Sequence, residues 1–116
     1  MGLGFFPRVI YKGSIAGGTF SIVAGNEKYI FSVGDTLIAA IKKNFDDDEY
    51  LVEKRIVIDE QCTDVPIKFS AEDTSVLPQN DEDGVFEVKL ISEDGQINEP
   101  VYQEKIRLGG VVIYEW

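Results

Sequence analysis

The sequence contains no histidine and a single cysteine, and both shortages limit the chemistry it can perform. Histidine is the side chain that most often acts as a general base near neutral pH, and its imidazole is a common metal ligand. The lone cysteine, Cys62, cannot form a disulfide within the chain, and no histidine is present to activate it as a nucleophile. We therefore expect Cys62 to be a half-buried thiol near a strand end, and we predict a non-enzymatic protein that uses no cofactor.

Basic residues are also scarce: the chain of 116 residues has 11 lysines and arginines against 21 aspartates and glutamates, a net charge of −10. Nucleic acids and anionic lipids are bound by clustered basic side chains, so we expect no nucleic-acid partner. Residues 46–99 hold 17 of the acids and only 4 of the bases. Two interpretations stay open: solvated acidic loops that discourage aggregation, or head-to-tail self-association of this acidic middle with the mildly basic ends of the chain.

Long hydrophobic runs are missing too. The run Leu37–Ile41 is far shorter than the ~20 residues that a membrane helix needs, so we expect no membrane insertion. The first residues carry no basic group ahead of their apolar side chains, and Pro7 interrupts them. We accordingly expect no signal peptide and a protein made in a cytoplasm.

Apolar side chains recur at every second position in short runs, and clusters of glycine, asparagine and aspartate separate these runs. This pattern predicts half-buried antiparallel strands. Because Pro66 cannot donate a ladder hydrogen bond, we expect its strand at a sheet edge. We expect a short helical turn near residues 72–78, capped by Ser70 or Asp73, with Val76 and Leu77 turned inward. The expected strands, of which the first two form a hairpin, cover residues 19–23, 28–33, 36–43, 50–59, 65–69, 84–92, 101–108 and 111–116.

These strands follow one another at intervals of about 8 to 12 residues, a spacing typical of an all-β sandwich. We expect seven to eight short antiparallel strands. We assign residues 19–116 to the sandwich and residues 1–18 to a less ordered, glycine-rich arm that contains a short strand at residues 8–12. Adjacent glycines at 109 and 110 indicate a bulge or bend that lets the chain cross between sheets.

Clustered carboxylates in the loops are weak candidates for a calcium site. Such groups bind calcium when a loop curls their oxygens around one point. Here consecutive acids point in different directions, and the alternating pattern and glycine of an EF-hand loop are missing. The alternative is that the loops are solvated and supply solubility. The metal candidates are Asp46, Asp48, Asp81 and Asp83.

Aromatic residues near the two ends of the sequence are candidates for an interface. One interpretation is that they fold back onto the sandwich, because large aromatic side chains are mostly buried. The other is that the arm and tail dock on a neighbouring subunit, as exposed aromatic residues do at binding hot spots. These residues are Phe5, Phe6, Tyr11 and Trp116.

Two segments of the sequence resemble one family. The segment Phe31–Leu37 reads Phe-x-x-Gly-Asp-Thr-Leu, and Ile67–Leu77, which ends in Glu-Asp-Thr-x-x-Leu, is followed by the aromatic strand Gly84–Leu90. Together they resemble small immunoglobulin-like proteins of tailed phages and prophages, including N-terminal domains of baseplate and receptor-binding-protein adaptors. The matching residues are scaffold residues: Gly34, Asp35, Thr36, Glu72, Asp73, Thr74, Leu77, Gly84 and Phe86.

The resemblance implies an immunoglobulin-like sandwich and carries over no catalytic residue. Phe86 lacks the hydroxyl of the corner tyrosine of antibody domains, and Val88 stands where they have a cysteine. The implied role is a structural component of a virion, in the tail or baseplate and made in a bacterial cytoplasm. Its expected partners are copies of itself or other virion proteins, in a homo-oligomer or a hetero-assembly. The alternative is a β-sandwich that binds a carbohydrate or a protein, with calcium if the acidic loops converge.

Overall fold

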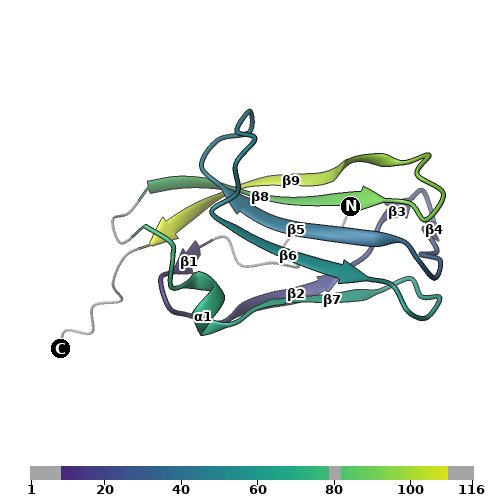
Figure 1. The fold of residues 1–116 in the computed structure, drawn as a ribbon, viewed down its shortest axis with the longest axis horizontal. Helices are drawn as coiled ribbons and strands as arrows, with labels where there is room; N and C mark the ends of the chain where they lie inside the picture. The colour runs from purple at the N-terminus through teal and green to yellow at the C-terminus, as the bar shows by residue number, and fades with distance from the viewer. Residues whose placement is uncertain (1–8, 79–81, 110–116) are drawn as a thin grey trace.

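A computed structural model describes residues 9–78 and 82–109, which form two layers of strands (Figure 1). A five-stranded sheet in the order β1-β9-β8-β5-β6 packs against the two-stranded sheet β2-β7, and the hairpin β3-β4 lies at one end. The predicted all-β sandwich is confirmed. The elements are β1 (Val9–Tyr11), β2 (Ala16–Phe20), β3 (Val23–Ala24), β4 (Glu27–Lys28), β5 (Thr36–Lys42), β6 (Val52–Val57), β7 (Val65–Phe69), α1 (Ala71–Thr74), β8 (Glu82–Ile91) and β9 (Asn98–Gly109).

The strand order follows the immunoglobulin-type layout. Strands β5, β8 and β9 are neighbours in one sheet, as strands C, F and G are, and β2 pairs with β7 in the other, as B does with E. All these pairs are antiparallel, whereas β1 joins β9 in parallel. The larger sheet is therefore mixed.

Alternating side chains build the core between the layers, as the sequence predicts. In β8 the side chains of Phe86, Val88 and Leu90 are buried, and Phe86 meets Phe69 of β7 edge to face at 6.4 Å between ring centroids. Pro66 lies in β7, which pairs only with β2 among the described strands, so its expected edge position is confirmed. Burial of these apolar side chains is the main force that holds the sheets together.

The predicted hairpin of residues 19–23 and 28–33 is wrong in its extent. The structure has only the two-residue strands β3 and β4 around Gly25, whose φ is +65°. After β4 the chain crosses the end of the sandwich, where Phe31 is fully buried and makes an isolated antiparallel bridge to the half-buried Cys62. Ile30 and Val33 stay exposed. One buried aromatic anchor therefore replaces the predicted strand.

The N-terminal part of the described chain belongs to the sandwich. Strand β1 lies inside the predicted segment 8–12, its Ile10 is in the core at 1 % exposure, and β2 begins at Ala16. No structural boundary therefore coincides with residue 19. The predicted strand 111–116 and Gly110 lie outside the described residues.

Helix α1 connects the two sheets. Ser70 caps it in a capping box: its Oγ accepts from the Asp73 backbone N at 3.1 Å, and Asp73 Oδ2 accepts from the Ser70 N at 2.8 Å. The same Oδ2 lies 2.9 Å from Lys54 Nζ of β6, and Thr74 Oγ1 donates to the Ser14 carbonyl at 2.6 Å. Leu77 is buried as predicted, but Val76 is exposed, so its predicted inward orientation is wrong. The capping turn ends at Ser75, and Val76 follows on the solvent side.

Candidate functional site

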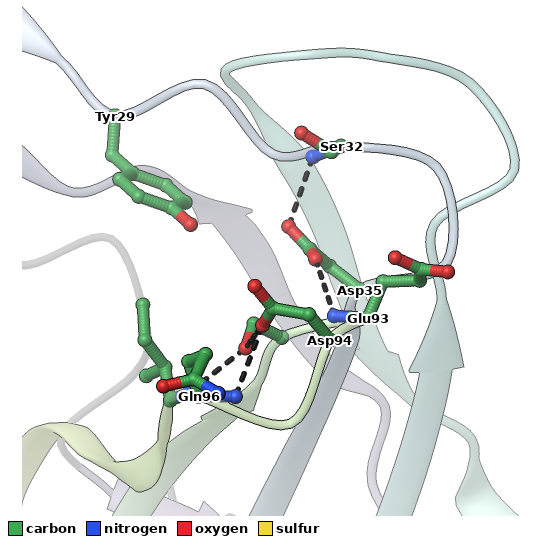
Figure 2. Close-up of a pocket in the computed structure, with 8 residues that line it drawn as sticks. Tyr29, Ser32, Asp35, Glu93, Asp94 and Gln96 are labelled. Carbon is green, nitrogen blue, oxygen red and sulfur yellow. Dashed lines mark hydrogen bonds between the residues drawn. The ribbon is translucent and has the colours of Figure 1, made fainter.

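A hollow of about 240 Å³ lies at one end of the sandwich, where the segment before β5 meets the turn between β8 and β9 (Figure 2). Figure 2 shows side chains from both segments turned toward the same space. The lining is polar and partly acidic. It consists of Tyr29, Ser32, Asp35, Ser92, Glu93, Asp94, Gln96 and Ile97.

Asp35 fastens the two walls of this hollow together. Its side chain is buried, with Oδ2 accepting from the Ser32 N at 2.9 Å and Oδ1 accepting from the Glu93 N at 2.9 Å (Figure 2). Gly34 beside it has a φ of +98°, and a Cβ there would come within 2.4 Å of the Glu93 Cγ. The Gly-Asp-Thr segment therefore has a physical purpose: it lets β5 begin directly against the β8–β9 turn.

Asp94 shapes the opposite wall. Its Oδ1 accepts from the Gln96 N at 3.0 Å and from Ser92 Oγ at 2.7 Å, while Ser92 Oγ in turn accepts from the Ile97 N at 2.9 Å. The Gln96 amide and the Ser92 hydroxyl hold the pKa of the Asp94 carboxyl below its usual value. The turn is thus a closed network of local hydrogen bonds, and Asp94 stays ionised at neutral pH.

Tyr29 lies at the upper left of Figure 2 and turns its hydroxyl toward the hollow. Its ring meets Phe31 edge to face at 5.1 Å between centroids. Burial raises the pKa of the Tyr29 phenol, and the negative charges of Asp35 and Asp94 raise it further. The phenol therefore remains a hydrogen-bond donor at neutral pH, opposite carboxylates that accept. Such a lining suits a hydroxyl-rich or cationic group, and hydrogen bonding is the chemistry that it offers.

A second polar cluster lies on the outer face of the five-stranded sheet. Lys42 of β5 and Glu87 of β8 are both buried, with Nζ and Oε1 2.9 Å apart. Lys42 Nζ also donates to the carbonyls of Phe45 and Asp47, which holds the β5–β6 loop over the sheet. Gln103 and Tyr50 donate to Glu87, Gln103 at 2.7 Å. A cleft of about 350 Å³ lies beside this cluster, under the acidic loop.

The sequence pattern does not predict this ion pair. Lys42 and Glu87 occupy alternate strand positions that face away from the core, where the period-two pattern predicts exposed side chains. The sequence of β5 does contain a signal that this face is covered: Ile38 and Ala40, on the same face as Lys42, are apolar, and both are buried. A central strand that is apolar on both faces indicates that its outer face is covered as well.

The described calcium candidates, Asp46, Asp48 and Asp83, do not form a common carboxylate cage. Asp46 and Asp83 line one hollow of about 290 Å³, but Lys43 and Lys105 line it too. Asp83 pairs with Arg107 at 2.7 Å, and Asp48 is exposed. Asp81 lies outside the described residues. Among residues 9–78 and 82–109, no group of three or more acids, cysteines or histidines is placed to hold a metal ion.

Of the aromatic interface candidates, only Tyr11 falls within the described residues. Its side chain is 37 % exposed and lies against the Gly109 backbone, where an added Cβ would come within 2.5 Å of the ring. Tyr11 therefore covers the parallel β1–β9 pair, and part of its ring remains open to solvent. Phe5, Phe6 and Trp116 lie outside the described residues.

The scaffold residues of the resemblance fall at both ends of the sandwich. Gly34, Asp35 and Thr36 lie at the end with the hollow, and Asp73 and Thr74 lie in α1 at the other end. Glu72 is exposed and solvated. Gly84 has Leu108 packed against it, with the leucine Cγ 2.8 Å from where a Cβ would stand, and Phe86 is in the core. These residues position loops and sheets relative to one another.

Comparison with known proteins gives no further assignment. No protein family, no curated protein and no solved structure matches this chain. No helix among the described residues is long and apolar enough to span a membrane.

Proposed function

We propose that this protein is a non-enzymatic structural component of a phage or prophage virion, in the tail or baseplate, that acts by assembling with other protein chains. One observation carries the proposal: the two segments that resemble phage immunoglobulin-like proteins supply hydrogen bonds and an ion pair that connect loops to sheets. Asp35 joins the walls at one end, and Asp73 with Thr74 joins α1 to β6 and to the β1–β2 connection at the other. These contacts support a structural block that would meet partner chains through its loops and edges.

The chemistry of the buried acids also favours a structural role. Both oxygens of Asp35 accept backbone hydrogen bonds, and Glu87 is engaged by Lys42, Gln103 and Tyr50. A general acid or base needs a pKa near the working pH and access to a substrate. Burial alone would raise the Glu87 pKa, but hydrogen bonds and the charge of Lys42 outweigh it and hold the pKa low, so this carboxylate stabilises the fold.

Sequencing the DNA on both sides of the gene tests this proposal. Genes for portal, tail or lysis proteins are expected next to it, because virion genes are clustered. Flanking genes unrelated to a phage would contradict the proposal.

A binding module is the second candidate, favoured by the hollow beneath Tyr29. A ligand that binds the folded state raises its melting temperature by mass action. We expect such a shift with a glycan, or with a glycan plus calcium, only if this candidate is right. A Tyr29→Phe variant, which keeps the ring and removes the phenol donor, should then lose the shift. An unchanged melting temperature across a glycan panel would contradict it.

A further inference from the structure

The outer edge of β6 is an open strand edge. In the five-stranded sheet β6 is the last strand and pairs only with β5 among the described residues. The Ile58 N donates to the Asp35 carbonyl at 2.8 Å, and this bond shows which residues of β6 direct their backbone groups toward β5. Because hydrogen-bonding residues alternate along an antiparallel strand, the backbone N–H and C=O groups of Glu53 and Arg55 point away from β5. Within residues 9–78 and 82–109 these groups have no backbone partner, and they can pair with another strand.

From this edge we infer that two copies of the chain associate through antiparallel pairing of β6 with β6, which joins their sheets into one. The inference deepens the proposed function and rests on it, because it names the first partner and the surface used. A two-fold axis perpendicular to the sheet places identical edges against each other with the same faces up.

Charge selects the register of this pairing. A two-fold axis through any residue of β6 keeps the faces aligned, and the axes at Lys54 and Arg55 pair the most residues of the strand. Each of these two registers sets one pair of identical charges on the axis, Lys54 opposite Lys54 or Arg55 opposite Arg55. Only the register centred on Lys54 also sets Glu53 of each copy opposite Arg55 of the other, and opposite charges across a sheet are favourable.

The side chains agree with this register. Glu53 and Arg55 are exposed, and no ion pair within residues 9–78 and 82–109 engages either one. On the other face Val52 would meet the Ile56 of the second copy, which extends the apolar core across the axis. The two Lys54 side chains meet near the axis, and each is already held 2.9 Å from Asp73 of its own chain.

The alternative explanation is that Glu53, Lys54 and Arg55 protect a monomer, since charged residues on an edge strand discourage pairing. Sedimentation of the full chain at about 150 mM salt separates the two explanations, since screening at that ionic strength limits the repulsion between two acidic copies. The inference predicts a concentration-dependent dimer. Arg55→Glu should weaken the dimer about tenfold or more, because it sets two glutamates opposite two glutamates. The swap E53R/R55E should restore wild-type dimerisation.

If Arg55 only stabilised its own chain, the E53R/R55E swap would not restore dimerisation. A dimer equally strong in wild type and R55E would overturn the inference, and so would a monomer at every concentration. Circular dichroism and melting temperature of each variant establish that it is folded. A folded R55E monomer beside a dimeric wild type and swap supports the inference.

Cross-linking provides a second test that does not depend on charge. In a Cys62→Ser background, Lys54→Cys should form a disulfide between copies, since Cα atoms of a directly opposed non-hydrogen-bonded pair lie about 4.5 Å apart. The matched control Arg55→Cys should not, because in this register its two Cα atoms are diagonal neighbours about 7–8 Å apart. Cross-linking of R55C in preference to K54C would overturn the register. If the neighbouring genes encode virion proteins but β6 does not pair, this inference is wrong and the proposed function stands. If β6 pairs but the neighbouring genes are unrelated to a phage, the proposed function is wrong.

Discussion

The Nζ of Lys42 lies 2.9 Å from the Oε1 of Glu87, on the outer face of a sheet, and both side chains are only 5 % exposed. Covering this pair needs the β5–β6 loop, and the lysine holds that loop through the carbonyls of Phe45 and Asp47. The pair thus links the central strands to the most acidic loop of the chain. Its network of donors and acceptors makes it sensitive to the loss of either partner.

Replacing Lys42 with methionine should destabilise the protein by about 3–5 kcal/mol, because it leaves the Glu87 carboxylate buried without its cation. The double variant K42M/E87M should recover a large part of this loss, since it leaves neither charge unpaired. Urea unfolding measures both. Lys43→Met is the control: Lys43 is exposed and lies 3.8 Å from Glu82, so its effect should stay within about 0.5 kcal/mol. Equal effects of K42M and K43M would contradict the assigned role.

The free energy of unfolding should fall as the pH falls, because Glu87 becomes protonated. Burial alone would raise its pKa, but hydrogen bonds from Lys42 and Gln103, the charge of Lys42 and the Tyr50 hydroxyl together lower it below the ordinary 4.5. The unfolded chain then binds this proton at higher pH than the folded one. The contribution is complete above pH 4.5 and is lost as the pH falls through the folded pKa. Unfolding free energies of wild type and Glu87→Gln should converge over that range; curves that stay parallel would refute the assignment.

Removing the Asp35 carboxylate should loosen the end of the sandwich that carries the hollow. Asp35→Ala removes the buried acceptor of two part-buried hydrogen bonds, from the backbone N–H groups of Ser32 and Glu93, which should cost about 1–2 kcal/mol. Amide hydrogen exchange should accelerate at those two positions and remain near wild type in β7. Uniform acceleration over the whole sandwich would indicate that Asp35 has no local role.

Gly34→Ala should also destabilise this end, by about 1–3 kcal/mol. The positive φ of +98° is strained for alanine, and the new Cβ would meet the Glu93 side chain at 2.4 Å. Gly13 is the control, because it shares a positive φ but a Cβ there meets nothing within 4 Å. Gly34→Ala is therefore expected to lower the melting temperature more than Gly13→Ala. The reverse order would show that the contact with Glu93 is unimportant.

Asp73→Ala should cost more than a helix cap alone. The substitution removes the capping box and the ion pair with Lys54, and the cap by itself is worth about 1 kcal/mol. Lys54 and the Ser70 amide also lower the pKa of Asp73, so its contribution too is lost in acid. Thermal unfolding near neutral pH should show a clear loss for D73A and little change for the exposed neighbour Glu72→Ala. Equal melting temperatures for D73A and E72A would show that Asp73 does not fix α1 to β6.

Alternation in the sequence predicts most of this fold, because period two reports directly on which strand face is buried. It places β5 to β9 within a few residues of their observed bounds. The missing N–H of Pro66 predicts its edge position, and the capping residues Ser70 and Asp73 predict the helical turn. The alternation fails at residues 28–33, where a strand-like pattern crosses the end of the sandwich and only Phe31 is fully buried. Local pattern carries no information about such a bridge to Cys62.

The candidate sites are less predictable than the fold, because they depend on which loops meet. The Gly-Asp-Thr segment marks Asp35 as a turn residue, but its second partner, the Glu93 amide, is 58 residues away in the sequence. Tyr29 and Asp94 come together for the same reason. Lys42 and Glu87 are read as solvent-facing until the position of the β5–β6 loop is known.

The most direct test of the central claim is the composition of phage particles from the strain that encodes the gene. Particles induced from that strain, banded on a density gradient and analysed by quantitative mass spectrometry, should contain this chain in a fixed ratio to a known tail protein across fractions. The ratio should persist after a salt wash that strips loosely bound protein. A chain that is expressed in the cells but absent from tailed particles, or removed completely by the wash, would contradict a structural role in the virion.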